Sequence, residues 1–246
     1  MIGVIGGMGP LATSDFFAKL IAATPATRDD DHIPVLIHSV PQLPSRPAAI
    51  LDGGPSPLPK LIEARDRLIE AGATLLAMPC NTAHFWAREM MAGCAVPLIH
   101  IADATREELA PRVKSGDLVG IIATRATLAG DVFTSTFRAL GVQMLIPTTA
   151  EYEARVAPAI AQVKRGDVKA AGAVLEPVIE SLRQRGAAVV VLACTELPVA
   201  LAAISSGAMP SCLDPTAALA RACVRAWGSR AGRAESTEPR TLTPTP

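Results

Sequence analysis

Aromatic residues are scarce in this sequence, and neither sign of charge is in excess. Among 246 residues there are five Phe, two Trp and one Tyr, and 23 basic residues balance 23 acidic ones. Proteins that bind single-stranded nucleic acid stack the bases on aromatic rings, and duplex-binding proteins carry a basic excess. We therefore expect no nucleic acid partner and no electrostatic attraction to an anionic membrane.

Long apolar runs and paired cysteines are also lacking. No run reaches the roughly 18 apolar residues that a membrane-spanning helix needs. The first segment has no basic residue before Lys19 and is interrupted by glycines, unlike a signal peptide, so we expect a cytoplasmic protein. The five cysteines include no CxxC pair, which argues against a disulfide framework and a zinc ribbon. The four histidines lack metal-ligand spacing, so we expect free thiols and no metal.

Short apolar runs alternate with longer amphipathic stretches along the chain. The runs that we expect to form strands are residues 2–5, 35–37, 75–78, 97–99, 119–122, 142–146 and 188–192. The stretches that we expect to form helices are residues 13–23, 58–71, 83–91, 103–114, 168–185 and 215–227. Continuous hydrophobic strands between helices are typical of a parallel sheet covered on both faces, which predicts an α/β fold.

Two segments far apart in the chain resemble each other. Residues 72–82 read GATLLAMPCNT, and residues 186–196 read GAAVVVLACTE. Each has a glycine at the end of a helix, then a buried strand, then a cysteine followed by small polar residues. Ligands of open α/β sheets bind at the carboxyl ends of the strands. Two similar half-domains facing each other would therefore bring both thiols into one cleft.

Two segments depart from this alternation. Residues 41–59 contain six prolines together with Gly53 and Gly54, and they predict a long loop that is functional or mobile. Residues 229–246 contain almost no hydrophobic side chains, so we expect a disordered tail outside the fold.

The glycine-rich turn after the first strand is a candidate anion site. Residues 7–12 read GMGPLA and formally fit the dinucleotide motif G-x-G-x-x-G/A. That motif needs an acidic residue at the end of the second strand, where residues 38–40 read HSV instead. Free N–H groups at a helix start suit a small carboxylate as well as a phosphate. A tight turn without any ligand is the alternative.

Cys80 stands between an expected strand and an expected helix. At such a position the exposed N–H groups and the helix dipole lower the pKa of a thiol. Asn81 and Thr82 can supply side-chain hydrogen bonds, and His84 is near enough in sequence to influence the thiol. The alternative is that Cys80 is a small buried hydrophobe, as most free cysteines are.

Cys194 repeats this arrangement in the second half of the chain. Thr195 and Glu196 follow it directly, and both could anchor or polarise the thiol. Alternatively, Glu196 caps the N-terminus of the next helix.

Together these motifs resemble the aspartate/glutamate racemase family, whose members work without pyridoxal phosphate. The resemblance extends from residue 1 to about residue 227 and is carried by IGGMGP at residues 5–10, MPCNTAH at 78–84, HIAD at 100–103 and CTEL at 194–197. It implies two Rossmann-like α/β half-domains related by a pseudo-twofold axis, with the active site between them, usually in a homodimer. Residues 1–100 and 205–228 would form the first half-domain, and residues 101–204 the second.

The resemblance also implies an activity and a set of site residues. The activity is cofactor-independent racemisation of aspartate, with glutamate or a wider set of amino acids as alternatives. Cys80 and Cys194 would remove and return the α-proton on opposite faces of the substrate. Arg46 and Lys164 match family residues that bind substrate carboxylates. The residues expected to orient the substrate are Met8, Asn81, Thr82, Ala83 and Thr195.

Two departures from the family pattern leave the substrate open. Ala193 stands where the family commonly has glycine before the cysteine, and residues 41–45 are less acidic than in a typical aspartate enzyme. Other functions on the same scaffold are a decarboxylase, which needs only one cysteine, and a hydantoin racemase. A non-catalytic amino-acid binder would keep Arg46 and Lys164 without needing thiols.

Overall fold

The computed structural model describes residues 1–235 as two α/β halves, each built on a four-stranded parallel sheet. The first sheet contains β1 (Ile2–Gly6), β2 (Val35–Ser39), β3 (Leu75–Ala77) and β4 (Leu98–Ile99), and the second contains β5 (Leu118–Ala123), β6 (Gln143–Leu145), β7 (Ala187–Ala193) and β8 (Cys212–Leu213). The strand order is β2-β1-β3-β4 in one sheet and β6-β5-β7-β8 in the other. This shared topology confirms the predicted α/β fold with two Rossmann-like half-domains.

Helices cover both sheets. Those of the first half are α1 (Pro10–Ala23), α2 (Arg46–Leu51), α3 (Leu58–Glu70) and α4 (Ala87–Met90), with 3-10 segments at Asp29–Asp31 and Thr82–Trp86. The others are α5 (Ile101–Leu109), α6 (Arg125–Ala129), α7 (Thr134–Leu140), α8 (Thr149–Glu151), α9 (Ala157–Lys164), α10 (Val168–Gln184), α11 (Glu196–Ala203) and α12 (Pro215–Glu235). Short segments of other helix types lie at Ala110–Arg112, Tyr152–Val156 and Met209–Ser211.

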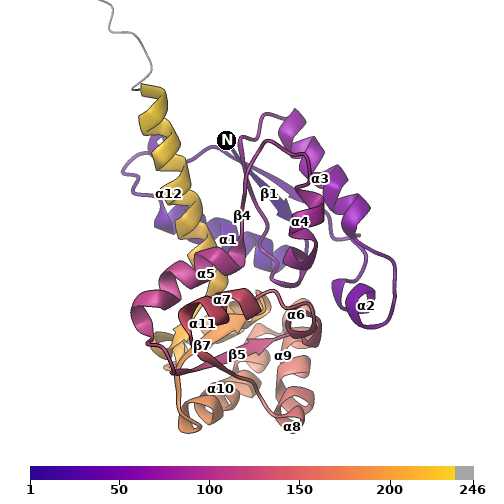
Figure 1. Cartoon of the computed structure of the whole chain (residues 1–246), viewed down its shortest axis with the longest axis vertical. Helices are drawn as coiled ribbons and strands as arrows, with labels where there is room; N and C mark the ends of the chain where they lie inside the picture. The colour runs from indigo at the N-terminus through magenta and orange to yellow at the C-terminus, as the bar shows by residue number, and fades with distance from the viewer. Residues whose placement is uncertain (236–246) are drawn as a thin grey trace, which may run out of the picture.

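The chain returns to the first half at α12, later than the sequence predicts. Residues 205–228 are expected in the first half, but β8 pairs with β7 in the second sheet. Helix α12 then packs against α1 and α5, and Figure 1 shows it running beside the first half. It continues to Glu235, past residue 229, where the disordered tail is expected to begin. The remainder of that tail, 236–246, lies outside the described residues.

The proline-rich segment 41–59 contains a helix that the sequence does not predict. Helix α2 begins at Arg46, after an N-cap at Ser45 whose hydroxyl accepts a hydrogen bond of 3.3 Å from the Ala48 N–H. It contacts α6 of the second half. Arg46 is therefore held at the start of a short helix of the first half that contacts the second half.

The turn after β1 depends on a glycine. Gly7 has a φ of +91°, and a Cβ atom at this position would lie 2.4 Å from the backbone nitrogen of Val40. Only glycine combines this left-handed conformation with so close an approach of the backbone. The chain can therefore turn sharply from β1 into α1 beside the end of β2.

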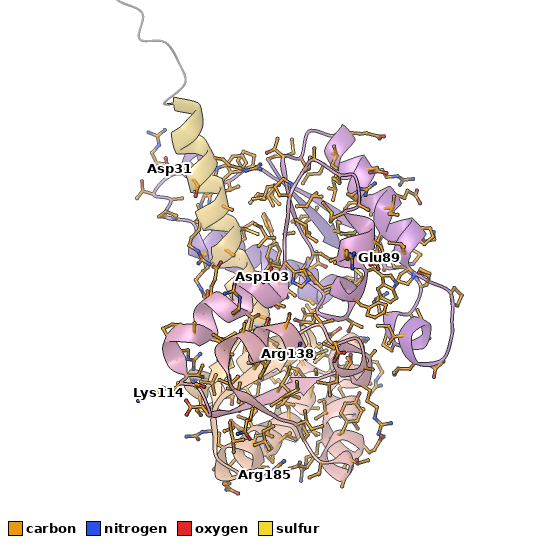
Figure 2. All side chains as sticks on the ribbon, viewed as in Figure 1. Asp31, Glu89, Asp103, Lys114, Arg138 and Arg185 are labelled. Atoms are coloured by element: carbon orange, nitrogen blue, oxygen red, sulfur yellow. The ribbon has the colours of Figure 1, made fainter. Side chains whose placement is uncertain are left out.

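Apolar and charged side chains separate as expected for two covered sheets. All residues of β1 and β3 are buried. The charged side chains labelled in Figure 2 are exposed on the outer surface; they are Asp31, Glu89, Asp103, Lys114, Arg138 and Arg185. Among the helices of residues 1–235, none combines the length and apolar character needed to cross a bilayer.

Candidate active site

Both predicted cysteines line one small cavity between the two halves. The cavity has a volume of about 30 Å³, enough for only a few water molecules. Its walls are formed by Met8, Arg46, Pro47, Cys80, Asn81, Thr82, Thr124, Lys164, Cys194, Thr195 and Glu196. All the predicted site residues are among them except Ala83, which is buried directly behind in the Thr82–Trp86 segment. We call this space the inner cavity.

A larger space adjoins the inner cavity. This outer cavity has a volume of about 520 Å³, within the range of small-molecule sites. Arg46, Lys164 and Glu196 line both spaces. The rest of the outer wall consists of Gly7, Gly9, Pro10, Leu11, Ala12, Pro41, Val163, Arg165 and Gly166. The outer cavity can therefore accommodate a small molecule, and it meets the inner cavity at Arg46, Lys164 and Glu196.

The Cys80 thiol lies after β3 in a buried environment. Burial raises its pKa, while the charge of Arg46 and the backbone N–H of Ala83 act in the opposite direction. The expectation that a helix start lowers this pKa is wrong for the structure described. The segment after Cys80 is a short 3-10 turn, Thr82–Trp86, and burial is the largest influence on the pKa of the thiol.

The Cys194 thiol is held by a carboxylate. Its Sγ donates a hydrogen bond of 3.0 Å to Oε2 of Glu196, and the Thr195 hydroxyl donates to the same oxygen at 3.2 Å. Burial, followed by the Glu196 charge, raises the pKa of Cys194 well above its usual value. Of the two roles considered for Glu196, the structure therefore supports contact with the thiol. The site thus pairs one thiol near a cation with one thiol near an anion.

Asn81 places an unpaired amide in the wall of the inner cavity. The side chain is 2% exposed, and neither its oxygen nor its nitrogen has a hydrogen-bond partner. Leaving such a group unpaired costs about 1–3 kcal/mol, and buried polar groups are nearly always satisfied. The amide is therefore available to a ligand with both a donor and an acceptor, such as an amino acid.

A cluster of three threonine hydroxyls joins the two halves beside the cysteines. The Thr82 Oγ1 lies 3.2 Å from that of Thr124 and 2.7 Å from that of Thr127, and the latter two are 2.9 Å apart. Sequence reasoning missed Thr124 and Thr127. Thr124 could have been found by its position, because it lies between β5 and the start of α6, just as Thr195 lies between β7 and the start of α11.

The two predicted carboxylate-binding cations are both present at the site. Nη1 of Arg46 donates to the carbonyls of Leu43 and Pro44 at 3.2 and 2.9 Å, which orients the guanidinium. Lys164 is exposed at the end of α9. Within the described part of the chain, neither side chain forms an ion pair with a carboxylate, although the Glu196 carboxylate lines the same two cavities.

His84 contacts the backbone of Cys80 and not its thiol. Its Nδ1 lies 2.9 Å from the Cys80 carbonyl oxygen.

No group of three or more His, Cys, Asp or Glu side chains placed to hold a metal ion occurs in the portion of the chain that the structure describes.

Comparison with known proteins agrees with this arrangement. The family model for Asp/Glu/hydantoin racemases matches residues 5–223. The chain belongs to this family. It is accordingly an isomerase of the racemase class.

Among related racemases, the broad-specificity amino-acid racemase RacX of Bacillus subtilis (strain 168) is 27% identical over 241 residues, covering 92% of this chain and 98% of that protein. The solved aspartate racemase of Picrophilus torridus is 30% identical, with a TM-score of 0.80 and coverage of 92% and 94%. An aspartate racemase homologue from Pyrococcus horikoshii OT3, 24% identical, has a TM-score of 0.69 with coverage of 93% and 98%, which shows the shared fold.

Proposed function

We propose that this racemase inverts the α-carbon of an amino acid without a cofactor, using Cys80 and Cys194 as its acid–base pair. One observation carries the proposal: the two thiols follow equivalent strands of opposite halves and line the same inner cavity. Inversion needs a base on one side of the α-carbon and an acid on the other. Two thiols from facing halves meet that requirement.

The proposed reaction moves two protons. The thiolate of one cysteine takes the α-proton, and the C–H electron pair is delocalised into the substrate carboxylate. The thiol of the other cysteine gives its proton to the opposite face, and the S–H electron pair stays on that sulfur. Cys80 is the base in one direction because Arg46 favours its thiolate, while Glu196 favours the protonated thiol of Cys194. In the other direction the two roles are exchanged.

Stabilising the carbanion is the difficult part of this reaction, because no cofactor withdraws its charge. Positioned cations and hydrogen-bond donors lower the energy of such a charge inside a buried site. Arg46 and Lys164 would bind the carboxylates, and the unpaired Asn81 amide would bind the substrate ammonium or carboxylate. The other groups proposed to orient the substrate are Met8, Thr82, Ala83 and Thr195.

Aspartate is the substrate that we propose first, with glutamate and other amino acids as alternatives. Two cations that form no ion pair within the described residues suit a substrate with two carboxylates. The similarity to an aspartate racemase supports this choice, and the similarity to a broad-specificity enzyme supports testing a wider set.

We also propose a cytoplasmic homodimer that forms through α1. Leu11, Phe17 and Ile21 on this helix are 44%, 36% and 44% exposed, with Ala18 and Ala22 exposed beside them. A second copy would bury this apolar face and the neighbouring rim of the outer cavity. Light scattering should give twice the chain mass, and Phe17→Glu should give the single-chain mass. A monomeric wild type would contradict the proposal.

The test of the activity is an exchange experiment in D₂O without added cofactor. L-Aspartate, L-glutamate and neutral and basic amino acids are each incubated with the protein, and chiral chromatography with mass spectrometry follows inversion and α-deuterium uptake. We expect both with aspartate, and a loss of about 10³-fold or more in Cys80→Ala and in Cys194→Ala. Full activity in either variant would refute the two-thiol mechanism.

The same assay separates the other functions and needs one control. Loss of CO₂ from a malonate would indicate a decarboxylase, turnover of a hydantoin would indicate a hydantoin racemase, and tight binding without turnover would indicate a binder. Alkylation experiments should use a Cys94→Ser background. Cys94 is only partly buried, whereas Cys80 and Cys194 are buried, so iodoacetamide would modify Cys94 first.

A further inference from the structure

The imidazole of His84 connects the Cys80 turn to the start of α5. His84 is buried in the 3-10 segment that follows Cys80. On one side of the ring, Nδ1 lies 2.9 Å from the Cys80 carbonyl oxygen. On the other side, the backbone N–H of Ile101 donates to Nε2 at 3.2 Å. One ring therefore links two backbone segments that are distant in the sequence.

The two contacts assign the protonation state of the ring. The Ile101 N–H can only donate, so Nε2 must accept and carry no proton. Nδ1 then carries the single proton of the neutral ring and donates it to the Cys80 carbonyl. Burial and the neighbouring His100 lower the pKa of His84 to about 3, against smaller opposing effects of the Cys80 and Ile99 backbone, which keeps the ring neutral near pH 7. Both bonds are thus made by one neutral tautomer.

The Cys80 backbone has few other anchors. Residues 78–81 lie between β3 and the 3-10 turn without regular secondary structure. The Cys80 N–H donates a hydrogen bond of 2.8 Å to the Met78 carbonyl. The Cys80 carbonyl accepts a hydrogen bond from the side chain of His84. The adjacent Asn81 side chain has no hydrogen bonds. The Thr82 hydroxyl holds the end of this segment against α6, and His84 holds the Cys80 carbonyl itself.

His100 provides an internal comparison. Its Nδ1 accepts a hydrogen bond of 3.2 Å from the Ala102 N–H, so His84 and His100 cap successive N–H groups at the start of α5. The two rings pack edge to face with their centroids 4.5 Å apart. His84 also holds Cys80, whereas His100 has no hydrogen bond to it among the described contacts.

We propose that His84 is a positioning residue for proton transfer at Cys80, because its ring fixes the Cys80 backbone against the start of α5. The role rests on the racemase function proposed above. Proton transfer requires the sulfur to lie within a narrow range of positions relative to the α-carbon, and a displacement of about 1 Å can cost on the order of 100-fold in rate. His84 itself does not touch the substrate, since it is absent from the walls of both cavities.

Two amide substitutions separate the contacts of the ring. The amide nitrogen of Asn reaches the place of Nδ1, so His84→Asn keeps a donor for the Cys80 carbonyl and loses the cap on Ile101. The amide group of Gln reaches the place of Nε2, so His84→Gln keeps an acceptor for Ile101 and loses the bond to Cys80. His100→Ala removes one cap of α5 and leaves Cys80 untouched.

The expected result is a difference in kcat that stability does not explain. His84→Gln should lose about 30-fold or more in kcat for aspartate with KM within about 3-fold, whereas His84→Asn and His100→Ala should stay within about 5-fold. Thermal unfolding measured on all three variants should show comparable losses. His84→Asn would then retain catalysis although it lacks the cap on the Ile101 N–H.

Other outcomes overturn the proposal in distinguishable ways. If wild type racemises aspartate but both His84 variants lose kcat equally, or neither does, the positioning role is refuted and the racemase function stands. If His84→Gln does not fold, a 30-fold loss of kcat in folded His84→Asn refutes the role, because that variant keeps the bond to Cys80. If wild type shows neither inversion nor exchange with any amino acid, the function fails and the positioning role fails with it.

Discussion

The hydroxyl oxygens of Thr82 and Thr127 lie 2.7 Å apart and form a hydrogen bond between the two halves of the protein. Thr82 follows Cys80 in the first half, and Thr127 lies on α6 in the second. Both side chains are buried. The halves are thus joined beside the reacting groups by neutral hydroxyls, whose bonding is insensitive to pH and salt.

Removing one of these hydroxyls should destabilise the protein. Thr127→Val leaves its partners partly unsatisfied in a buried place, which costs about 1–3 kcal/mol of unfolding free energy. Thr127→Ser keeps the hydroxyl and should cost less. Urea unfolding measures both variants. The double variant Thr82→Val/Thr127→Val should lose less than the sum of the single losses; strict additivity would show that the two hydroxyls do not interact.

Replacing Arg46 should move the pH dependence of catalysis to higher pH. Arg46 lowers the pKa of Cys80 against the larger effect of burial. In Arg46→Gln the thiolate forms at higher pH, so the rising limb of kcat/KM shifts upward, and KM for aspartate increases about 10-fold or more as a carboxylate contact is lost. The exposed Arg183, on α10, provides the control: Arg183→Gln should leave the profile in place. An unchanged limb in Arg46→Gln would contradict the proposed role.

Replacing Glu196 should move the profile the other way. The Glu196 charge raises the pKa of Cys194, so Glu196→Gln lowers that pKa and shifts the profile of kcat/KM to lower pH. At every pH the two enantiomers must keep equal kcat/KM, because their equilibrium constant is one. Initial rates measured from both D- and L-aspartate check both statements. A shift to higher pH would show that Glu196 does not act on Cys194 by its charge.

Acidification should weaken the fold through His84. Its pKa is about 3 in the folded protein and about 6.5 in an unfolded chain, so between these values the unfolded state binds more protons. Stability therefore falls as the pH falls, and His84 alone should remove about 2 kcal/mol between pH 7 and pH 5. Urea unfolding at the two pH values should show a smaller loss in His84→Asn. Equal losses would mean that the ring titrates normally.

The sequence predicts the sheets better than the short elements. The buried strands appear as continuous apolar runs, and the repeat around Cys80 and Cys194 predicts their equivalent places in the two halves. β8, Cys212–Leu213, is missed because no apolar run surrounds it, unlike the equally short β4. Helix α2 is missed because the prolines around it predict a loop. Ser45 followed by Arg46 and Pro47 is nevertheless a recognisable helix start.

The residues of the site are more predictable than their electrostatics. The motifs identify most charged and polar residues of the inner cavity as catalytic or substrate-binding candidates; the exceptions are Thr124 and Glu196. Glu196 is nevertheless predicted as a possible partner of Cys194. The direction of the thiol pKa shifts depends on how completely the two halves exclude water, which no local pattern encodes. The contact between His84 and Ile101 likewise joins segments that only the folded chain brings together.

Helix α12 also affects the order in which the protein is completed during synthesis. The core beneath β1 and α1 includes Leu219, Ala220 and Cys223, near the end of the described chain. One core of the second sheet lies between Ile122 and Cys212, whereas the core on its other face includes Ala218 and Ala222 of α12. The ribosome releases the N-terminal half first, yet that half lacks part of its interior until α12 emerges. The half that is translated first therefore cannot complete its interior until nearly all of the second half has been translated.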